Sequence, residues 1–192
     1  FMYQDLKNEV LGNTFGFYGH FNFYFLKRRL MLRVGQGFVV ATNPYDKTSN
    51  PKNIAFGSKL LGSPYLMLNY KKPNVLGPIG IQSGLVFFHA SNGSFKAPNT
   101  SVNTIAFNIG INYDLDTKEI IYEAPPEMAE VSKALNYNFV LRSGINQTDV
   151  VGSKQYPFYT FSAYAEKRFN FFSALQFGVD AFFSYALKEE IK

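Results

Sequence analysis

The 192-residue chain contains no cysteine and no tryptophan. It also has no run of roughly eighteen apolar residues, the length that a transmembrane helix needs. The absence of cysteine excludes disulfides, thiolate nucleophiles and cysteine-bound metals. The first residues, Phe1–Asp5, lack the charged and apolar regions of a secretory signal peptide.

Lysine and arginine, 19 in total, outnumber the 14 acidic residues and give the chain a net charge of +5. A basic chain can bind nucleic acid, anionic lipid or a phosphorylated glycolipid. Many of the cations stand between apolar segments, at Lys27–Arg29, Lys71–Lys72 and Lys167–Arg168, and do not form one continuous stripe. We therefore predict that nucleic acid is not a partner.

Aromatic residues are abundant, with 21 phenylalanines and 13 tyrosines, and apolar and polar side chains alternate along most of the chain. Between 15 and 26, for example, Phe15, Phe17, Phe21 and Phe23 alternate with small, polar or amphipathic residues. Alternation with a period of two predicts β-strands that have two different faces. We expect eight strands, at about 15–26, 30–42, 60–70, 77–91, 102–115, 135–145, 155–166 and 171–186.

A soluble β-sandwich also shows this alternation. The length of the strands and the composition of their polar faces must therefore distinguish a soluble sandwich from a transmembrane β-barrel. The expected strands have about ten residues or more, which suits a tilted membrane crossing. Their polar faces are rich in glycine, asparagine and serine, as a crowded and watery lumen requires. We predict an all-β, antiparallel transmembrane β-barrel of a Gram-negative outer membrane, with at least eight strands in this stretch.

Short connections at Lys27–Arg29, Lys71–Asn74 and Lys167–Asn170 alternate with longer ones. Because outer-membrane barrels have short periplasmic turns and long outer loops, we expect the first strand to run toward the periplasm and the last to end outside. Residues 1–192 are then a single barrel domain and an internal portion of a longer barrel, with about ten to twelve strands in the complete protein. The connection at 116–134 is too long for this pattern, and we expect a small helix around Pro126–Lys133.

The segment Phe88–Asn99 combines residues that can carry out chemistry. His89 and Ser91 are two positions apart on an expected strand, so they point to the same face. That face is the apolar one, where polar side chains are costly unless they lie near the membrane interface or have a function. A histidine base beside a serine hydroxyl is the minimum for an activated oxygen nucleophile. Asn103, on the next strand, has the parity to lie beside His89.

A purely structural interpretation of the same three residues is equally open. His89, Ser91 and Asn103 could mark the polar interfacial ends of two strands. The other histidine, His20, is expected on the lumen face as a hydrogen-bonding group.

The motif His89-x-Ser91-Asn92-Gly93, followed by Pro98 and Asn99, resembles the signature of the lipid A 3-O-deacylase family, the PagL-like outer-membrane esterases. Further segments resemble the longer family members described as acyloxyacyl hydrolases: Tyr3–Leu6, Leu11–Asn13, Asn43–Asp46 and Asn50–Ser58. The resemblance covers about Tyr3 to Leu115.

This resemblance implies a serine hydrolase that cuts an ester-linked 3-hydroxyacyl chain from lipid A in the outer leaflet. Ser91 would be the nucleophile and His89 the general base. The candidates for oxyanion stabilisation would be Asn92, Asn99 and the backbone amide of Gly93. The scheme requires neither a metal nor a cofactor.

The third member of the family's triad is an acidic residue fourteen positions after the histidine, and this chain has Asn103 there. The chain therefore departs from the family pattern at this position. A neutral amide can hold an imidazole tautomer, but it stabilises the imidazolium ion less than a carboxylate does.

The expected partner is membrane lipid, namely lipid A or lipopolysaccharide, and Lys96 is a candidate to pair with a lipid A phosphate. The simpler interpretation of Lys96 is a solvated loop charge. An alternative function is a non-catalytic barrel subunit that retains the motif within a larger complex of outer-membrane proteins. A small pore or ligand carrier is a third, since barrels of more than eight strands have room inside.

Overall fold

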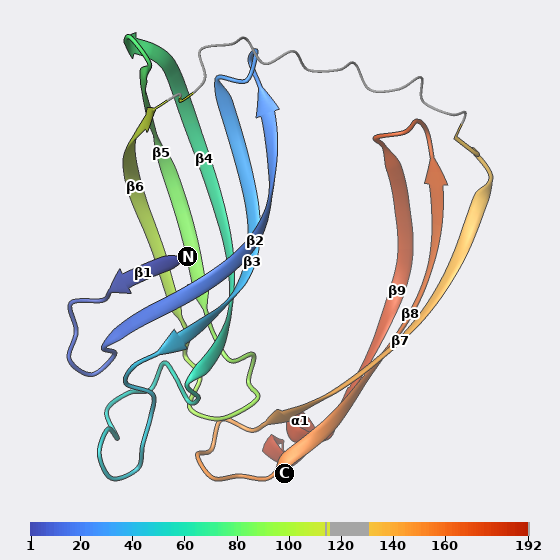
Figure 1. Cartoon of the computed structure of the whole chain (residues 1–192). Helices are drawn as coiled ribbons and strands as arrows, with labels where there is room; N and C mark the ends of the chain where they lie inside the picture. Colours follow the sequence, from blue (N-terminus) through green and yellow to red (C-terminus); the bar gives the residue numbers. More distant parts are fainter. Residues whose placement is uncertain (114, 116–130, 192) are drawn as a thin grey trace. The chain divides into compact units, whose positions relative to one another are not determined.

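The computed structural model describes residues 1–113, 115 and 131–191 of the chain. In these residues nine antiparallel strands form two sheets, each described below by itself (Figure 1). The prediction of an all-β, antiparallel fold with at least eight strands is confirmed. In the described part of the chain, no helix is long and apolar enough to cross a membrane.

The first sheet is a six-stranded antiparallel meander, because each strand pairs with the next one along the chain. Its strands are β1 (Met2–Asp5), β2 (Asn13–Phe25), β3 (Leu30–Ala41), β4 (Leu60–Leu76), β5 (Ile79–Ala90) and β6 (Val102–Tyr113). The loop that joins β3 to β4 and the loop that joins β5 to β6 leave the sheet at the same end (Figure 1).

The strand register gives this sheet one apolar face, because apolar side chains at alternate positions pair across neighbouring strands. Phe17 is opposite Phe38, and Leu66 is opposite Phe87. The members of this apolar face are largely exposed, most clearly on β6: Ile105, Phe107, Ile109 and Ile111. A row of exposed isoleucine and phenylalanine side chains is suited to contact with lipid.

The opposite face of the first sheet carries polar and tyrosine side chains that bond across strands. The hydroxyls of Tyr18 and Ser63 are 2.9 Å apart, and Arg33 Nε donates to Asn22 Oδ1 at 2.7 Å. His20 lies on this polar face, as predicted, but its ring makes no hydrogen bond within the described part of the chain.

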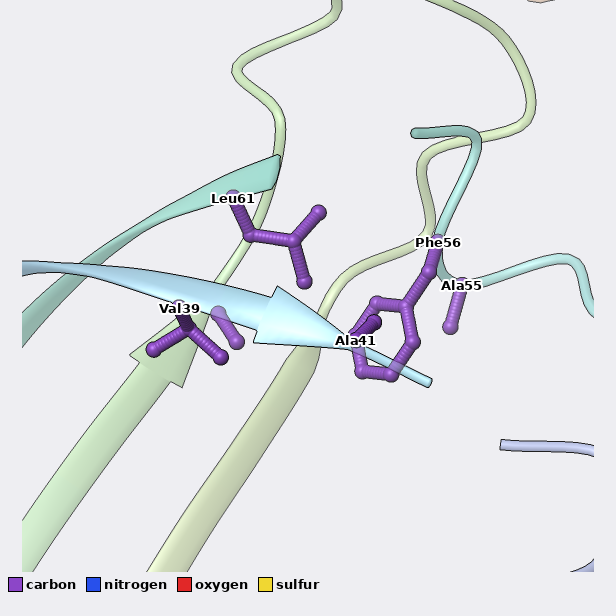
Figure 2. Packing of buried hydrophobic residues seen from close by; sticks show 6 residues of the cluster. Val39, Ala41, Ala55, Phe56 and Leu61 are labelled. Carbon is purple, nitrogen blue, oxygen red and sulfur yellow. The ribbon is translucent and has the colours of Figure 1, made fainter. Parts of the chain in front are cut away.

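A small apolar core closes the end of the first sheet from which the two long loops emerge. The last residues of β3 and the first of β4 meet Ala55 and Phe56 of the β3–β4 loop, and Figure 2 shows the Phe56 ring lying against Ala41. Phe56 is completely buried. The members of the core are Val39, Ala41, Ala55, Phe56, Leu61 and Ala90. The loop therefore folds back onto the sheet and does not extend freely from it.

The second sheet contains β7 (Leu135–Gln147), β8 (Gln155–Arg168) and β9 (Ala174–Ser184), followed by the short helix α1 (Tyr185–Glu190). Three side chains form a polar ladder across its strands. Arg142 Nη1 donates to Ser162 Oγ at 2.6 Å, and Ser162 Oγ donates in turn to Asp180 Oδ1. This sheet also has one polar and one apolar face, as the alternation predicts.

Several strand limits differ from those expected. The strand β1 was not predicted, because four residues are too few for a periodic signal. The fourth observed strand continues to Leu76, beyond the expected end at Tyr70. The last strand ends at Ser184, because its hydroxyl caps the helix α1 by accepting from the Leu187 amide. Most of the helix expected around Pro126–Lys133 falls outside the described residues, and 131–133 are not helical.

Candidate active site

His89 and Asn103 form a cross-strand pair near the loop end of β5 and β6. Both occupy positions of the apolar face, and His89 Nδ1 lies 2.7 Å from Asn103 Oδ1. An amide oxygen only accepts, so Nδ1 carries the proton of this contact, which in a neutral imidazole is the Nδ1–H tautomer. The other ring nitrogen, Nε2, then keeps a free lone pair and can act as a base.

Ser91 follows β5 directly and is held by the backbone of β4. Gly62 N donates to Ser91 O at 2.7 Å, and Ser91 N donates to Gly62 O at 3.1 Å. This isolated bridge keeps the register of the β4–β5 pairing, three residues beyond the pair Tyr65–Phe88, so Ser91 has the same parity as His89. The sheet thus brings His89 and Ser91 to one face, as the spacing predicts.

Asn99 lies beside the Ser91 hydroxyl and offers it a donor. Asn99 Nδ2 is 3.1 Å from Ser91 Oγ, and Asn99 Oδ1 accepts from the backbone amide of Asn92 at 3.0 Å. The contact with the Asn92 amide fixes which end of the Asn99 side chain carries the oxygen. The backbone amide of Gly93 also donates to Ser91 Oγ, at 2.9 Å. Two N–H donors, from Gly93 and Asn99, therefore converge on one hydroxyl oxygen.

Asn92, a predicted oxyanion donor, makes hydrogen bonds inside its own loop. Its Nδ2 donates to the Lys96 carbonyl at 2.6 Å, and its backbone amide is occupied by Asn99. Its Oδ1 is buried and has no partner in the described part of the chain. Asn92 stiffens the turn between β5 and Asn99, and it uses one of the two N–H groups of its Nδ2 for the Lys96 carbonyl.

The imidazole of His89 and the hydroxyl of Ser91 are not hydrogen-bonded to each other within the described residues. Ser91 Oγ is directed to Asn99 Oδ1 at 3.3 Å. Catalytic hydrogen bonds are often absent or long in an empty site and form when the substrate binds. Rotation about χ1 is the motion that would turn the Ser91 hydroxyl from Asn99 toward His89.

Lys96 is the one cation of the β5–β6 loop, residues 91–101, and it is exposed. Hydrogen bonds from the amides of Ser49 and Thr48 hold the pKa of Asp46 below its ordinary value, and the positive charge of Lys96 lowers it further. Lys96 is therefore close enough to Asp46 for the two charges to interact, while the Lys96 side chain remains exposed to solvent.

The sequence did not reveal how closely the β3–β4 loop packs against the residues around Ser91. Thr100 donates to the Ile54 carbonyl through its backbone amide at 3.0 Å and through its hydroxyl at 3.1 Å. The one sequence feature that pointed to this loop was its family resemblance, at Asn43–Asp46 and 50–58. These segments have no periodicity from which their packing could be predicted. Within the described ranges, no three His, Asp or Glu side chains are grouped as metal ligands would be.

An antiparallel sheet with one exposed apolar face and one polar face is typical of a transmembrane β-barrel. The sequence model of the lipid A 3-O-deacylase (PagL) family matches residues 1–112, which include the first sheet up to the last residues of β6. The chain belongs to this family. Comparisons with curated proteins and with solved structures gave no match.

Membership of the family assigns the general activity, which is deacylation of lipid A by hydrolysis. The substrate is therefore a membrane lipid. The family match and the antiparallel strands are consistent with an outer-membrane protein.

Proposed function

We propose that the chain is an outer-membrane serine esterase that removes an ester-linked acyl chain from lipid A or a related glycolipid. The observation that carries this proposal is the arrangement around Ser91 on the apolar face. An oriented imidazole stands two residues before it, and two N–H donors point at its hydroxyl oxygen.

The proposed reaction begins when Ser91 Oγ attacks the ester carbonyl carbon and its proton passes to His89 Nε2. The tetrahedral intermediate then collapses by breaking the bond to the sugar oxygen, which takes the proton from His89. Water hydrolyses the acyl-serine in the same way and releases the fatty acid. Asn103 acts by holding the His89 ring through Nδ1.

The oxyanion of the tetrahedral intermediate is assigned to the Gly93 amide and the Asn99 side chain. Both donate to Ser91 Oγ, so they stand beside the position of the carbonyl oxygen once its carbon is bonded to that atom. Asn92 contributes indirectly, because its backbone amide orients Asn99.

The proposed placement is an integral barrel whose active site lies near the outer leaflet. The apolar face can accept lipid chains along its length, while the ester is held at the polar end where Ser91 lies. Lys96, exposed in the neighbouring loop, is then available to pair with a phosphate of lipid A.

The second candidate is a non-catalytic subunit of a larger outer-membrane complex. It is favoured by one observation, the neutral Asn103 at the position where the family has an acid. Without a carboxylate, the imidazolium that forms during attack loses stabilisation.

Mass spectrometry of lipid A from cells that express the complete protein or its Ser91→Ala variant tests both candidates. Ser94→Ala is the matched control, since Ser94 is an exposed serine in the same loop. The esterase predicts loss of one hydroxyacyl chain with the parent and with Ser94→Ala, and intact lipid A with Ser91→Ala. Intact lipid A with all three proteins, each confirmed in the membrane, would favour the non-catalytic subunit.

A further inference from the structure

The loop between β3 and β4 contacts the β5–β6 loop at two points, and these points lie on either side of Asn99. On one side, Gly57 packs so tightly that a Cβ atom there would overlap the carbonyl oxygens of Lys96 and Pro98. On the other side, Thr100 donates twice to the Ile54 carbonyl. The backbone just before and just after Asn99 is thus held by one neighbouring loop.

The β3–β4 loop can serve as a rigid support because its own interior is fixed. Asn53 is completely buried, and its Oδ1 accepts from the amides of Ala55 and Phe56 at 3.0 Å each. Its Nδ2 donates to the Asn43 carbonyl at 2.6 Å. The buried Phe56 ring then anchors the loop in the core at the end of the sheet (Figure 2).

We propose that Gly57 and Thr100 are positioning residues for the oxyanion donor Asn99. This inference rests on the proposed esterase function. Gly57 permits the close approach of the two loops, and the Thr100 hydroxyl holds the residue after Asn99 against Ile54. Neither residue bonds to Ser91 or His89. Their effect on the reaction passes through the position of Asn99 Nδ2, which is 3.1 Å from Ser91 Oγ.

Gly57→Ala is the first test, with the full chain folded in detergent micelles and purified lipid A as the substrate. The added methyl group meets backbone atoms that cannot rotate away, so the 96–98 segment must shift and carry Asn99 with it. A displacement of about 1 Å at a catalytic group can cost roughly 100-fold in rate. We expect kcat to fall by about tenfold or more, with KM within about twofold of the parent.

Gly19→Ala is the matched control, since a Cβ at Gly19 in β2 would have no atom within 4 Å. Its kcat is expected to equal that of the parent. A Gly57→Ala protein that is folded and keeps the parent's kcat would overturn the assignment of Gly57.

A pair of variants at Thr100 decides the outcome if Gly57→Ala does not fold. Thr100→Val removes the hydroxyl but keeps the shape, and Thr100→Ser keeps the hydroxyl. Loss of one neutral hydrogen bond predicts a fall in kcat of roughly two- to tenfold for Thr100→Val and a rate close to the parent's for Thr100→Ser. Equal rates for both variants would overturn the proposal.

Hydrogen exchange of the peptide 91–101 separates failure of this inference from failure of the esterase assignment. Faster exchange in Gly57→Ala or Thr100→Val than in Gly19→Ala supports the positioning contact even if the parent has no esterase activity. Unchanged exchange in both variants rejects it, whatever the activity of the parent.

Discussion

His89 and Asn103 are paired across β5 and β6, with the imidazole Nδ1 2.7 Å from the amide oxygen. In the proposed esterase this pair orients the imidazole as a catalytic triad does, but without the negative charge of a carboxylate. A carboxylate at position 103 would accept the same hydrogen bond and would also stabilise the imidazolium as it forms.

Asn103→Asp is therefore expected to raise kcat of lipid A deacylation, because aspartate has the same shape and adds the missing charge. The expected gain is about tenfold or more, since the reverse change in a buried triad costs on the order of 10⁴ and Asn103 is exposed. The rate is measured by release of hydroxy fatty acid from lipid A micelles. Thr104→Ser on the opposite face serves as the control, and an unchanged or lower rate in Asn103→Asp would contradict the role assigned to position 103.

The two asparagines of the loop are predicted to differ in their effect on catalysis. Asn99→Ala removes a donor that points at Ser91 Oγ, and loss of one oxyanion donor typically costs about 10²–10³ in kcat. Asn92→Ala removes only the bond to the Lys96 carbonyl and leaves that donor in place, so a smaller loss is expected. The prediction is checked by measuring kcat of both variants. Equal losses of kcat would show that Asn99 is not the oxyanion donor.

Much of the fold could be predicted because alternation reports directly on the two faces of a strand. Phe17, Phe21 and Phe23 repeat at the strand period, and the structure places them together on the exposed apolar face. The His89–Asn103 pair followed from the same parity, once the two strands were taken as a hairpin. Strand geometry fixes which side chains share a face, so the sequence carries this information locally.

The support around Asn99 could not be predicted in the same way. The contact between Gly57 and the 96–98 segment joins two loops without periodicity, far apart in sequence. The Asn53 hydrogen bonds depend on how the β3–β4 loop folds back, which no repeat encodes. The hydrogen bond from Asn92 Nδ2 to the Lys96 carbonyl could not be predicted either, because it depends on how the β5–β6 loop folds.

Phe56→Ala is expected to destabilise the folded protein by about 3–5 kcal/mol, because the ring is completely buried and the cavity it leaves is lined by β3 and β4. Ile54→Ala is the matched control, since the Ile54 side chain is 60% exposed and its carbonyl is retained. That change is expected to cost less than about 1 kcal/mol. Guanidinium titration in lipid vesicles, followed by gel mobility, gives both values. Similar midpoints for the two variants would show that Phe56 does not anchor the loop.

The membrane placement of the apolar face can be tested with two arginine substitutions on β6. Ile109 is 77% exposed on the apolar face, whereas Asn112 occupies a position of the polar face on the same strand. If the apolar face meets lipid, Ile109→Arg places a charge in hydrocarbon and lowers the free energy of unfolding by about 2–4 kcal/mol in phosphatidylcholine vesicles. Asn112→Arg keeps its charge away from lipid and is expected to change this energy by less than about 1 kcal/mol. If this face met water instead, arginine at position 109 would not lower the free energy of unfolding. Equal unfolding free energies for the two variants would therefore show that the apolar face does not contact the bilayer.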